Sequence, residues 1–257
     1  MKAREIADIK EGFAPLPTQE PWDNAGFCIG SPDTEVKGVL VGFDCTPELI
    51  MEAVEKGANM VITHHPLIFK GVRKISPDTF LGSAITLAVK NDVVVYAAHT
   101  NADKAVQGVN DLMADRLGLK NRTLLSDEGI GLVGELPEPV DTAEFITFVK
   151  RQFGLRSLRT SRPIEGPVRK VALCSGSGGS FIDNALAAGA DVYISGDISY
   201  HNFFTGKGFM LMDIGHYESE IEIVDKFISL LVAELSEKTI TFAVLRSSTN
   251  NNPIYYF

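Results

Sequence analysis

Two stretches of equal length decide the fold: VLVGFDCTPELIMEAVEKGANMVITHH (residues 39–65) and VALCSGSGGSFIDNALAAGADVYISGD (residues 171–197). Each begins with an apolar run and passes through a turn into a segment whose apolar residues recur at helical spacing. Each then ends in a second apolar run. This pattern predicts a strand, a helix and a second strand, which is the repeating unit of α/β proteins.

The two stretches align without a gap at an offset of 132 residues. The identical pairs fall on the first strand, the helix core face, the helix-ending glycine and the second strand: Val39/Val171, Ile50/Ile182, Ala53/Ala185, Gly57/Gly189, Ala58/Ala190 and Ile62/Ile194. These are the positions that a duplicated unit must keep. We therefore expect an α/β fold of two duplicated, three-layer-like halves with mainly parallel sheets, residues 1–125 and 126–257, packed closely as one unit.

A further apolar run follows each repeated stretch and leads into a histidine. Residues 93–98 precede His99, and residues 209–214 precede Gly215 and His216. An acid follows each histidine at the same spacing, Asp103 in the first half and Glu220 in the second. Ligands of parallel sheets gather beyond the carboxyl ends of the strands. We expect the following residues at such ends, with a metal site between the halves: His64, His65, His99, Asp197 and His216.

The paired histidines favour two metal ions over one. Adjacent side chains at a strand tip point to opposite sides, so His64 and His65 suit two neighbouring ions. Glu220 lies one helical turn after His216, and its two oxygens can bridge two ions. Alternatively, the histidine pair is an exposed strand terminus, and each acid only complements a helix dipole.

Three other motifs have ordinary structural explanations. The loop Ser175–Ser180 follows a strand and opens a helix, so it is either a phosphate-binding turn or a tight structural turn. Asp44 either orients a ligand or caps a helix. Trp22-Asp23-Asn24 is expected to be a structural turn.

Two helices have clear boundaries. Asp141 with Glu144 predicts a capped helix reaching about Phe153. The stretch from His216 to Leu235 predicts one amphipathic helix with a common apolar face formed by Ile221, Val224, Phe227, Ile228 and Leu231.

Composition excludes several classes of protein. The 257 residues include 24 basic and 33 acidic side chains, and the net charge of −9 disfavours nucleic acid as a partner. No apolar stretch approaches the roughly 18 residues of a membrane span, and the charged start is unlike a secretory signal, so we expect a cytoplasmic protein. The three cysteines are expected to be reduced thiols, and without a CxxC pair a thiolate zinc site has no support.

Five runs together resemble the Nif-three-like dinuclear metal centre family, whose members are called GTP cyclohydrolase I type 2 homologues. The runs are EPWDNAGFCIG, GANMVITHHPLIFK, AAHTNADKAVQGVND, GSGGSFIDNALAAGADVYISGDISYH and GHYESE. The chain resembles the short form of the family, because the region between Asp103 and the Ser-Gly loop is too short for an inserted domain.

The resemblance implies the metal ligands and the assembly. His64 and His216 bind one ion, His65 and Asp103 bind the other, and Glu220 bridges them. His99 and His201 resemble pocket histidines that are candidates for proton transfer. The family also implies a ring-shaped homohexamer. The donor set of three histidines and two carboxylates suits zinc, iron or manganese as the two divalent ions, and equally cobalt or nickel, so it leaves the metal identity open.

Two functions fit this centre. The first is a metal-dependent hydrolase of a nucleotide or related compound, with GTP ring opening or phosphoester hydrolysis as reactions. The alternative is a non-enzymatic metal-binding ring, acting as a scaffold or regulatory partner, in which the same histidines only orient ligands.

Overall fold

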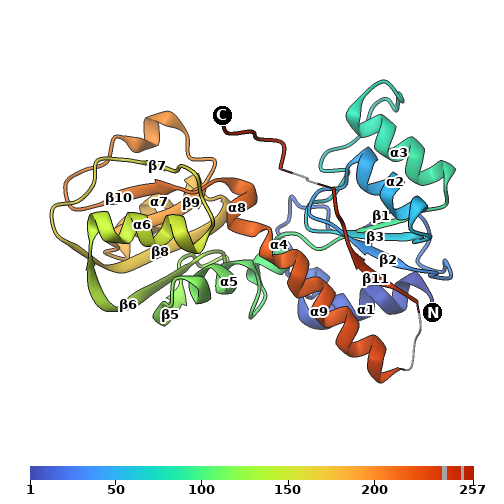
Figure 1. Ribbon diagram of the computed structural model, residues 1–257, viewed down its shortest axis with the longest axis horizontal. Coiled ribbons are helices and arrows are strands. Elements are labelled where there is room, and N and C mark those ends of the chain that lie inside the picture. Colours follow the sequence, from blue (N-terminus) through green and yellow to red (C-terminus); the bar gives the residue numbers. More distant parts are fainter. Residues whose placement is uncertain (239–241, 250–251) are drawn as a thin grey trace. The chain divides into compact units, whose positions relative to one another are not determined.

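The computed structural model describes residues 1–238, 242–249 and 252–257, and the chain forms two compact units (Figure 1). Unit 1 comprises Met1–Ala105 and Ile223–Tyr255, and unit 2 comprises Val106–Glu222 and Tyr256–Phe257. The first segment of unit 1 thus ends at Ala105, and the last helix and the last strand of the chain return to this unit. Among the described helices, none is both long and apolar enough to cross a membrane.

Unit 1 is built on a five-stranded sheet with the order β1-β4-β3-β2-β11. All neighbouring strands are parallel except β1, which is antiparallel to β4. Its strands are β1 (Gly26–Ile29), β2 (Val39–Val41), β3 (Met60–Thr63), β4 (Val94–Ala97) and β11 (Val244–Arg246). Its helices are α1 (Ala3–Phe13), η1 (Leu16–Thr18), α2 (Pro47–Glu55), α3 (Phe80–Lys90), α4 (Thr100–Lys104) and nearly all of α9 (Glu222–Glu237).

Helices cover both faces of this sheet. Helices α2 and α3 pack on one face through a buried apolar cluster that includes Leu40, Leu49, Ala84 and Val95. Helices α1 and α9 lie on the other face (Figure 1). Because both faces are covered, strands β2, β3 and β4 are buried along their whole length.

Unit 2 is built on a six-stranded sheet with the order β5-β6-β8-β9-β10-β7. Its strands are β5 (Lys120–Leu124), β6 (Leu132–Asp141), β7 (Arg159–Thr160), β8 (Pro167–Ser177), β9 (Val192–Gly196) and β10 (Met210–Asp213). Its helices are α5 (Val109–Arg116), α6 (Thr142–Gln152), η2 (Gly179–Phe181), α7 (Ile182–Ala187), η3 (Tyr200–Phe203) and α8 (His216–Glu220).

The α/β class is confirmed, and both sheets are mixed: parallel neighbours predominate in unit 1 and antiparallel neighbours in unit 2. In unit 2 only β8-β9 and β9-β10 are parallel, whereas β5, β6 and β7 join antiparallel. The expectation of mainly parallel sheets therefore holds for unit 1 and for the repeated strands of unit 2. In unit 2 the consecutive strands β5 and β6 are joined by a short loop, a connection that suits antiparallel neighbours.

The internal repeat is visible in the strand register. Val39 pairs with Met60 in unit 1, and Val171 pairs with Val192 in unit 2. Both partners are shifted by the same 132 residues (171 − 39 and 192 − 60), so the alignment read from the sequence is also the alignment of the two parallel strand pairs.

The capped helix is confirmed as α6, whose N-cap Asp141 accepts hydrogen bonds from the amides of Ala143 and Glu144. The expected last helix is instead two helices, α8 and α9, with Ile221 between them. In α8 the Ser219 hydroxyl donates to the His216 carbonyl and accepts from the Gly176 amide, contacts that hold this short helix to strand β8. The predicted apolar face is largely buried at Val224, Phe227 and Leu231.

Candidate metal centre

Two neighbouring parallel strands bring three histidines together in unit 1. Thr63, the last residue of β3, pairs with Ala97, the last residue of β4. His64 and His65 therefore follow one strand end, and His99 follows the next. Their ring centroids lie 4.8 Å apart for His64 and His65, 5.3 Å for His64 and His99, and 5.2 Å for His65 and His99.

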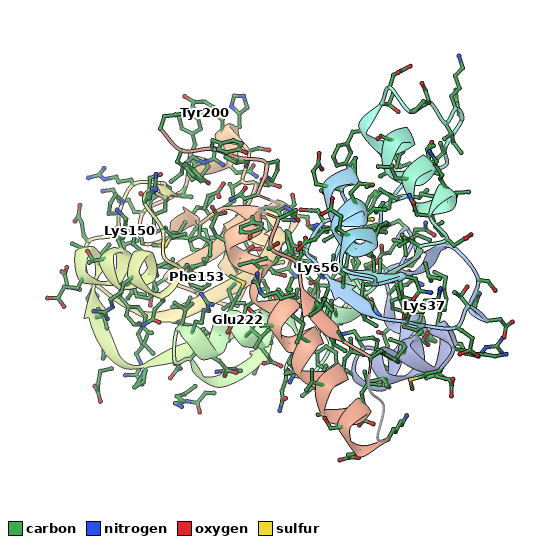
Figure 2. The ribbon with its side chains drawn as sticks, turned by 45° about the vertical axis from the view of Figure 1, so that its right-hand side comes forward. Lys37, Lys56, Lys150, Phe153, Tyr200 and Glu222 are labelled. Atoms are coloured by element: carbon green, nitrogen blue, oxygen red, sulfur yellow. The ribbon has the colours of Figure 1, made fainter. Side chains whose placement is uncertain are left out.

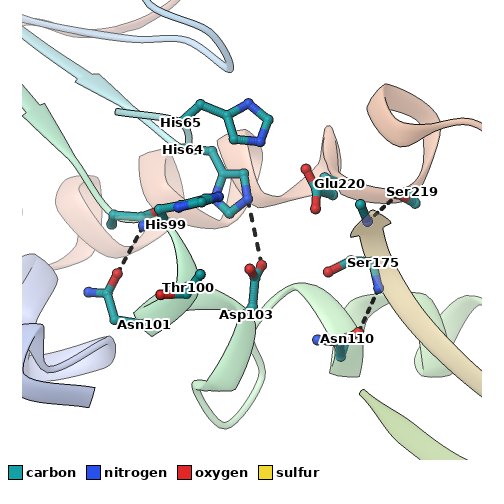
Figure 3. Close-up of polar contacts among 12 residues, drawn as sticks. His64, His65, His99, Thr100, Asn101, Asp103, Asn110, Ser175, Ser219 and Glu220 are labelled. Atoms are coloured by element: carbon teal, nitrogen blue, oxygen red, sulfur yellow. Dashed lines mark hydrogen bonds and ion pairs between the residues drawn. The ribbon is translucent and has the colours of Figure 1, made fainter. Parts of the chain in front are cut away.

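The same cluster contains Asp103, which lies one turn along α4 from His99 (Figure 3). The Nε2 atom of His64 is 3.6 Å from Oδ1 of Asp103. His64 is fully buried and His99 is nearly so. One ligand nitrogen from each of the three histidines lies within 4.8 Å of the other two, a grouping that could hold a metal ion.

Each of these rings is held by an oxygen acceptor at Nδ1. His64 Nδ1 donates to the Ala98 carbonyl at 3.0 Å, and His65 Nδ1 donates to Asp44 Oδ1 at 2.7 Å. His99 Nδ1 donates to Asp23 Oδ1 at 2.8 Å. A carbonyl or carboxylate oxygen only accepts, so the proton of each neutral ring is on Nδ1 and the lone pair is on Nε2.

Asp23, expected to be part of a structural turn, orients His99. Its side chain is completely buried and also accepts hydrogen bonds from the amide and hydroxyl of Thr100. Burial alone would raise the pKa of Asp23, but the hydrogen bonds from His99 and Thr100 and the charge of His99 lower it to about 2. The carboxylate therefore stays ionised, and nothing in the local sequence indicated a partner 76 residues away.

In unit 2, the end of β10 brings His216 to a second cluster. Gly215, with φ of +92°, turns the chain into α8. His216 Nδ1 donates to Asp197 Oδ2 at 2.7 Å, and His216 Nε2 lies 3.1 Å from Glu220 Oε2. The Glu220 side chain is only 4% exposed. Asp197, predicted at a strand end, follows β9 and holds the histidine in the same way as Asp44 holds His65.

The first part of the Ser-Gly loop supports this second cluster. The Ser175 amide donates to Asn110, the Gly176 amide to Ser219 and the Gly178 amide to Ser195. These three residues form a tight structural turn, whereas Gly179 and Ser180 line a cavity of about 320 Å³. Gly176 also has φ of +58°, and a Cβ atom there would collide with the Glu220 carboxylate.

His201 lies apart from these residues within unit 2. It is exposed on η3, and its ring packs on Phe204 and Tyr200, the latter labelled in Figure 2. It lines a cavity of about 320 Å³ whose described lining includes Asp183 and Asn202 but neither His216 nor Glu220.

A larger cavity, about 700 Å³, opens beside His65 in unit 1. Asp44 is part of its wall, so the carboxylate that orients His65 also faces the cavity. The remaining lining residues are Cys45, Thr46, Glu48, Pro66, Leu67, Phe80, Thr249, Asn252, Pro253 and Tyr255. This volume is in the range of pockets that hold small molecules.

The donor set fits a divalent transition metal. It offers imidazole nitrogens whose tautomer is fixed by carboxylates or a carbonyl, which is the arrangement found behind metal-bound histidines. The nearby carboxylates add oxygen donors, and no cysteine is part of either cluster among the described residues. Imidazole and carboxylate ligands suit zinc, iron and manganese.

Known proteins are similar to this chain in sequence over nearly its whole length. A Clostridium perfringens protein named GTP cyclohydrolase 1 type 2 homolog is 35% identical over 256 residues, which cover 96% of this chain and 97% of that protein. A Streptococcus pneumoniae protein with the same name is 34% identical over the full length of both chains.

Solved structures agree. A Bacillus cereus protein related to NIF3 has the same fold, with a TM-score of 0.92 at 24% identity, covering 100% of this chain and 99% of that one. Reduced HcgD from Methanocaldococcus jannaschii has a TM-score of 0.84 at 29% identity, covering 97% and 98%. The family model described as Duf34/NIF3 (NGG1p interacting factor 3) matches residues 1–253, and the chain therefore belongs to the DUF34/NIF3 family.

Proposed function

We propose that this protein binds two divalent metal ions and is a metal-dependent hydrolase of a nucleotide or related compound. Its ligands would be His64, His65 and Asp103 from unit 1 together with His216 and Glu220 from unit 2. Glu220 would serve both ions through its two oxygens.

The observation that carries the proposal is that four histidines are oriented in the same way, each by an oxygen acceptor at Nδ1. Three carboxylates and one carbonyl, drawn from separate parts of the chain, each accept the Nδ1 proton of a different histidine. A histidine that only fills a core needs no such uniform tautomer. A neutral ring whose proton is held on Nδ1 has its Nε2 lone pair ready to act as a ligand or as a base, as in His64, His65 and His99.

The chain's own groups supply proton transfer. Bound divalent ions would provide Lewis acidity and a low-pKa water source. His99, with its lone pair on Nε2, can accept a proton, and Asp23 stabilises the imidazolium that forms while holding the ring in place. His99 is better placed for this role than His201, which lines a different cavity.

The test is turnover of GTP, followed by other nucleotides and phosphoesters. The protein would be reconstituted separately with iron, manganese and zinc, and metal content measured in parallel. Metal-dependent turnover that is lost in Glu220→Gln supports the hydrolase. Two bound ions without turnover of any compound would favour the scaffold or regulatory alternative.

A matched pair of variants tests the proton carrier. His99→Gln should reduce turnover by about 100-fold or more, as expected for loss of a general base, with metal content largely kept. His201→Gln removes a histidine from the other cavity and should leave turnover near that of the unmodified protein. Equal loss in both variants would remove His99 from this role.

A further inference from the structure

A basic segment follows the histidine pair and has no partner in the fold described above. It runs FKGVRK over residues 69–74, and Lys70, Arg73 and Lys74 are all exposed. Among the described residues these three side chains form no ion pair or hydrogen bond. The segment therefore carries a local positive charge in a chain whose net charge is −9.

Residues that flank this segment in the sequence line the cavity beside His65. Leu67 before it and Phe80 after it line the 700 Å³ cavity that contains His65. The Phe69 ring lies 5.8 Å from the His99 ring and 5.7 Å from the Trp22 ring. Lys70 directly follows Phe69, and Arg73 and Lys74 follow within the next four residues, so the basic segment begins beside the histidines.

The cavity beside His65, unlike the basic segment, is lined by acidic side chains. Asp44 and Glu48 line it, and no lysine or arginine does so among the described residues. In the metal-free protein this lining offers no positive side chain to an anionic group. Its aromatic walls, Phe80 and Tyr255, suit a planar ring, and Asn252 adds an amide that can donate and accept hydrogen bonds.

We infer that residues 69–74 form an anion subsite that binds the phosphate of a mononucleotide-like substrate, while the planar ring enters the acidic cavity. Lys70, Arg73 and Lys74 supply the positive charge, and a phosphate dianion is the group they suit best. The inference rests on the proposed function for the identity of the reacting site. A small anion is favoured over nucleic acid because the rest of the chain is acidic and would repel a long polyanion.

Trp22 provides a direct probe, because it is the only tryptophan, is 58% exposed and packs against Phe69. The experiment titrates GMP and guanosine into metal-free protein at low salt and follows tryptophan fluorescence. Without metal, phosphate cannot bind through an ion. GMP should bind about tenfold more tightly than guanosine, and added salt should reduce this difference.

The decisive variant is Lys70→Ala/Arg73→Ala/Lys74→Ala. It should lose the preference for GMP and keep guanosine binding. The control, Lys37→Ala/Lys90→Ala/Lys207→Ala, removes the same charge at exposed positions outside the segment and should keep the preference (Lys37 is labelled in Figure 2).

Three outcomes overturn the inference: no preference for GMP in the unmodified protein, the same preference in both triple variants, or tighter binding of a single-stranded oligonucleotide than of GMP. Metal content, measured separately on loaded protein, tests the proposed function. Loss of metal binding with an intact GMP preference would refute the metal centre alone. Normal metal content without a GMP preference would refute the anion subsite alone.

Discussion

A histidine binds a metal ion through one ring nitrogen. The hydrogen bond that the other ring nitrogen donates fixes the tautomer and so decides which nitrogen carries the lone pair. Here the partners of that second nitrogen are Asp23, Asp44, Asp197 and the Ala98 carbonyl. The histidines and their acids could be predicted from the sequence because strand ends and a four-residue spacing are local patterns. Asp44 and Asp197 could also be singled out as polar residues near a predicted site. The pairing of each carboxylate with its histidine could not be predicted, since the two lie 19 to 76 residues apart and meet only after the sheet has formed.

Gly176 lies so close to the Glu220 carboxylate that a side chain at this position would not fit. Gly176→Ala should displace the Glu220 carboxylate and lower the bound metal, because a Cβ atom at this position would overlap that group. Metal content by elemental analysis, with the melting temperature of the same samples, is the measurement.

Gly189→Ala is the matched control for this prediction. Gly189 also has positive φ, +68°, so alanine introduces similar backbone strain of about 1–3 kcal/mol, but no atom lies within 4 Å of the new Cβ. Gly189→Ala should lower the melting temperature without lowering the metal content. Full metal content in Gly176→Ala would show that Glu220 does not need its present position.

At the scale of elements, local signals predicted the repeated strands and helices and failed where distant segments meet. The strand Met60–Thr63 and the helix after Asp141 follow from alternation of apolar runs and from a cap. By contrast, β11 pairs with β2 across about two hundred residues, Val244 with Val39. No periodicity in residues 244–246 indicates that partner, because three residues carry too little pattern to specify a neighbour.

Glu52 on α2 fixes the chain that follows β11. Its side chain is 8% exposed and accepts hydrogen bonds from the hydroxyls of Ser247 and Ser248 and from the Ser248 amide, with Lys56 as its ion partner. Glu52→Gln should lower the free energy of unfolding by about 1–3 kcal/mol at pH 7, as loss of hydrogen bonds to a buried charge does. Chemical denaturation measures it.

The pH dependence of this effect has a definite sign. Burial alone would raise the pKa of Glu52, but hydrogen bonds from Lys56, Ser247 and Ser248 outweigh it and hold the pKa well below its ordinary value. The unfolded chain therefore takes up the proton first, and the advantage of glutamate over glutamine should shrink as pH falls below about 4.3. A difference that stays constant from pH 7 to pH 3 would contradict this account.

Lys10 on α1 is a charged residue inside the packing of unit 1. It is fully buried, its ammonium lies 3.0 Å from the centre of the Phe227 ring, and Nζ has no hydrogen-bond partner among the described residues. Burial and the nearby charge of Lys226 lower its pKa well below the ordinary value. Lys10→Met should therefore raise the free energy of unfolding at pH 7 by about 1–3 kcal/mol.

The gain from Lys10→Met should shrink as pH rises toward about 10.4. A lysine with a lowered pKa destabilises the fold wherever the unfolded chain is protonated, and that cost disappears when both states are neutral. Unfolding curves at pH 7 and pH 10 measure the trend. A methionine variant that is less stable at pH 7 would show that the ammonium over Phe227 is favourable.

At the scale of the whole molecule, duplication explains both the fold and the distribution of chemistry. The two repeats share the register of their parallel strands, so each places its site residues at the same ends of its sheet. The repeats are not chemically equal, because the position aligned with His65 is Asp197, which orients a histidine and is not itself one. The ring-shaped homohexamer stays a prediction from the resemblance, and light scattering of the purified protein tests it.

The last prediction concerns how many metal ions depend on Glu220 and how many depend on Asp103. If Glu220 serves both ions, Glu220→Gln should lower the occupancy of both, whereas Asp103→Asn should chiefly lower one, since Asp103 is proposed as a ligand of a single ion. Glutamine and asparagine keep the size of each side chain, so packing around the nearly buried Glu220 is preserved. Metal equivalents per chain, counted after equilibration with each ion, should fall toward zero in the first variant and toward one in the second. Equal loss in the two variants would mean that Glu220 binds a single ion, and the centre would then need another bridging group.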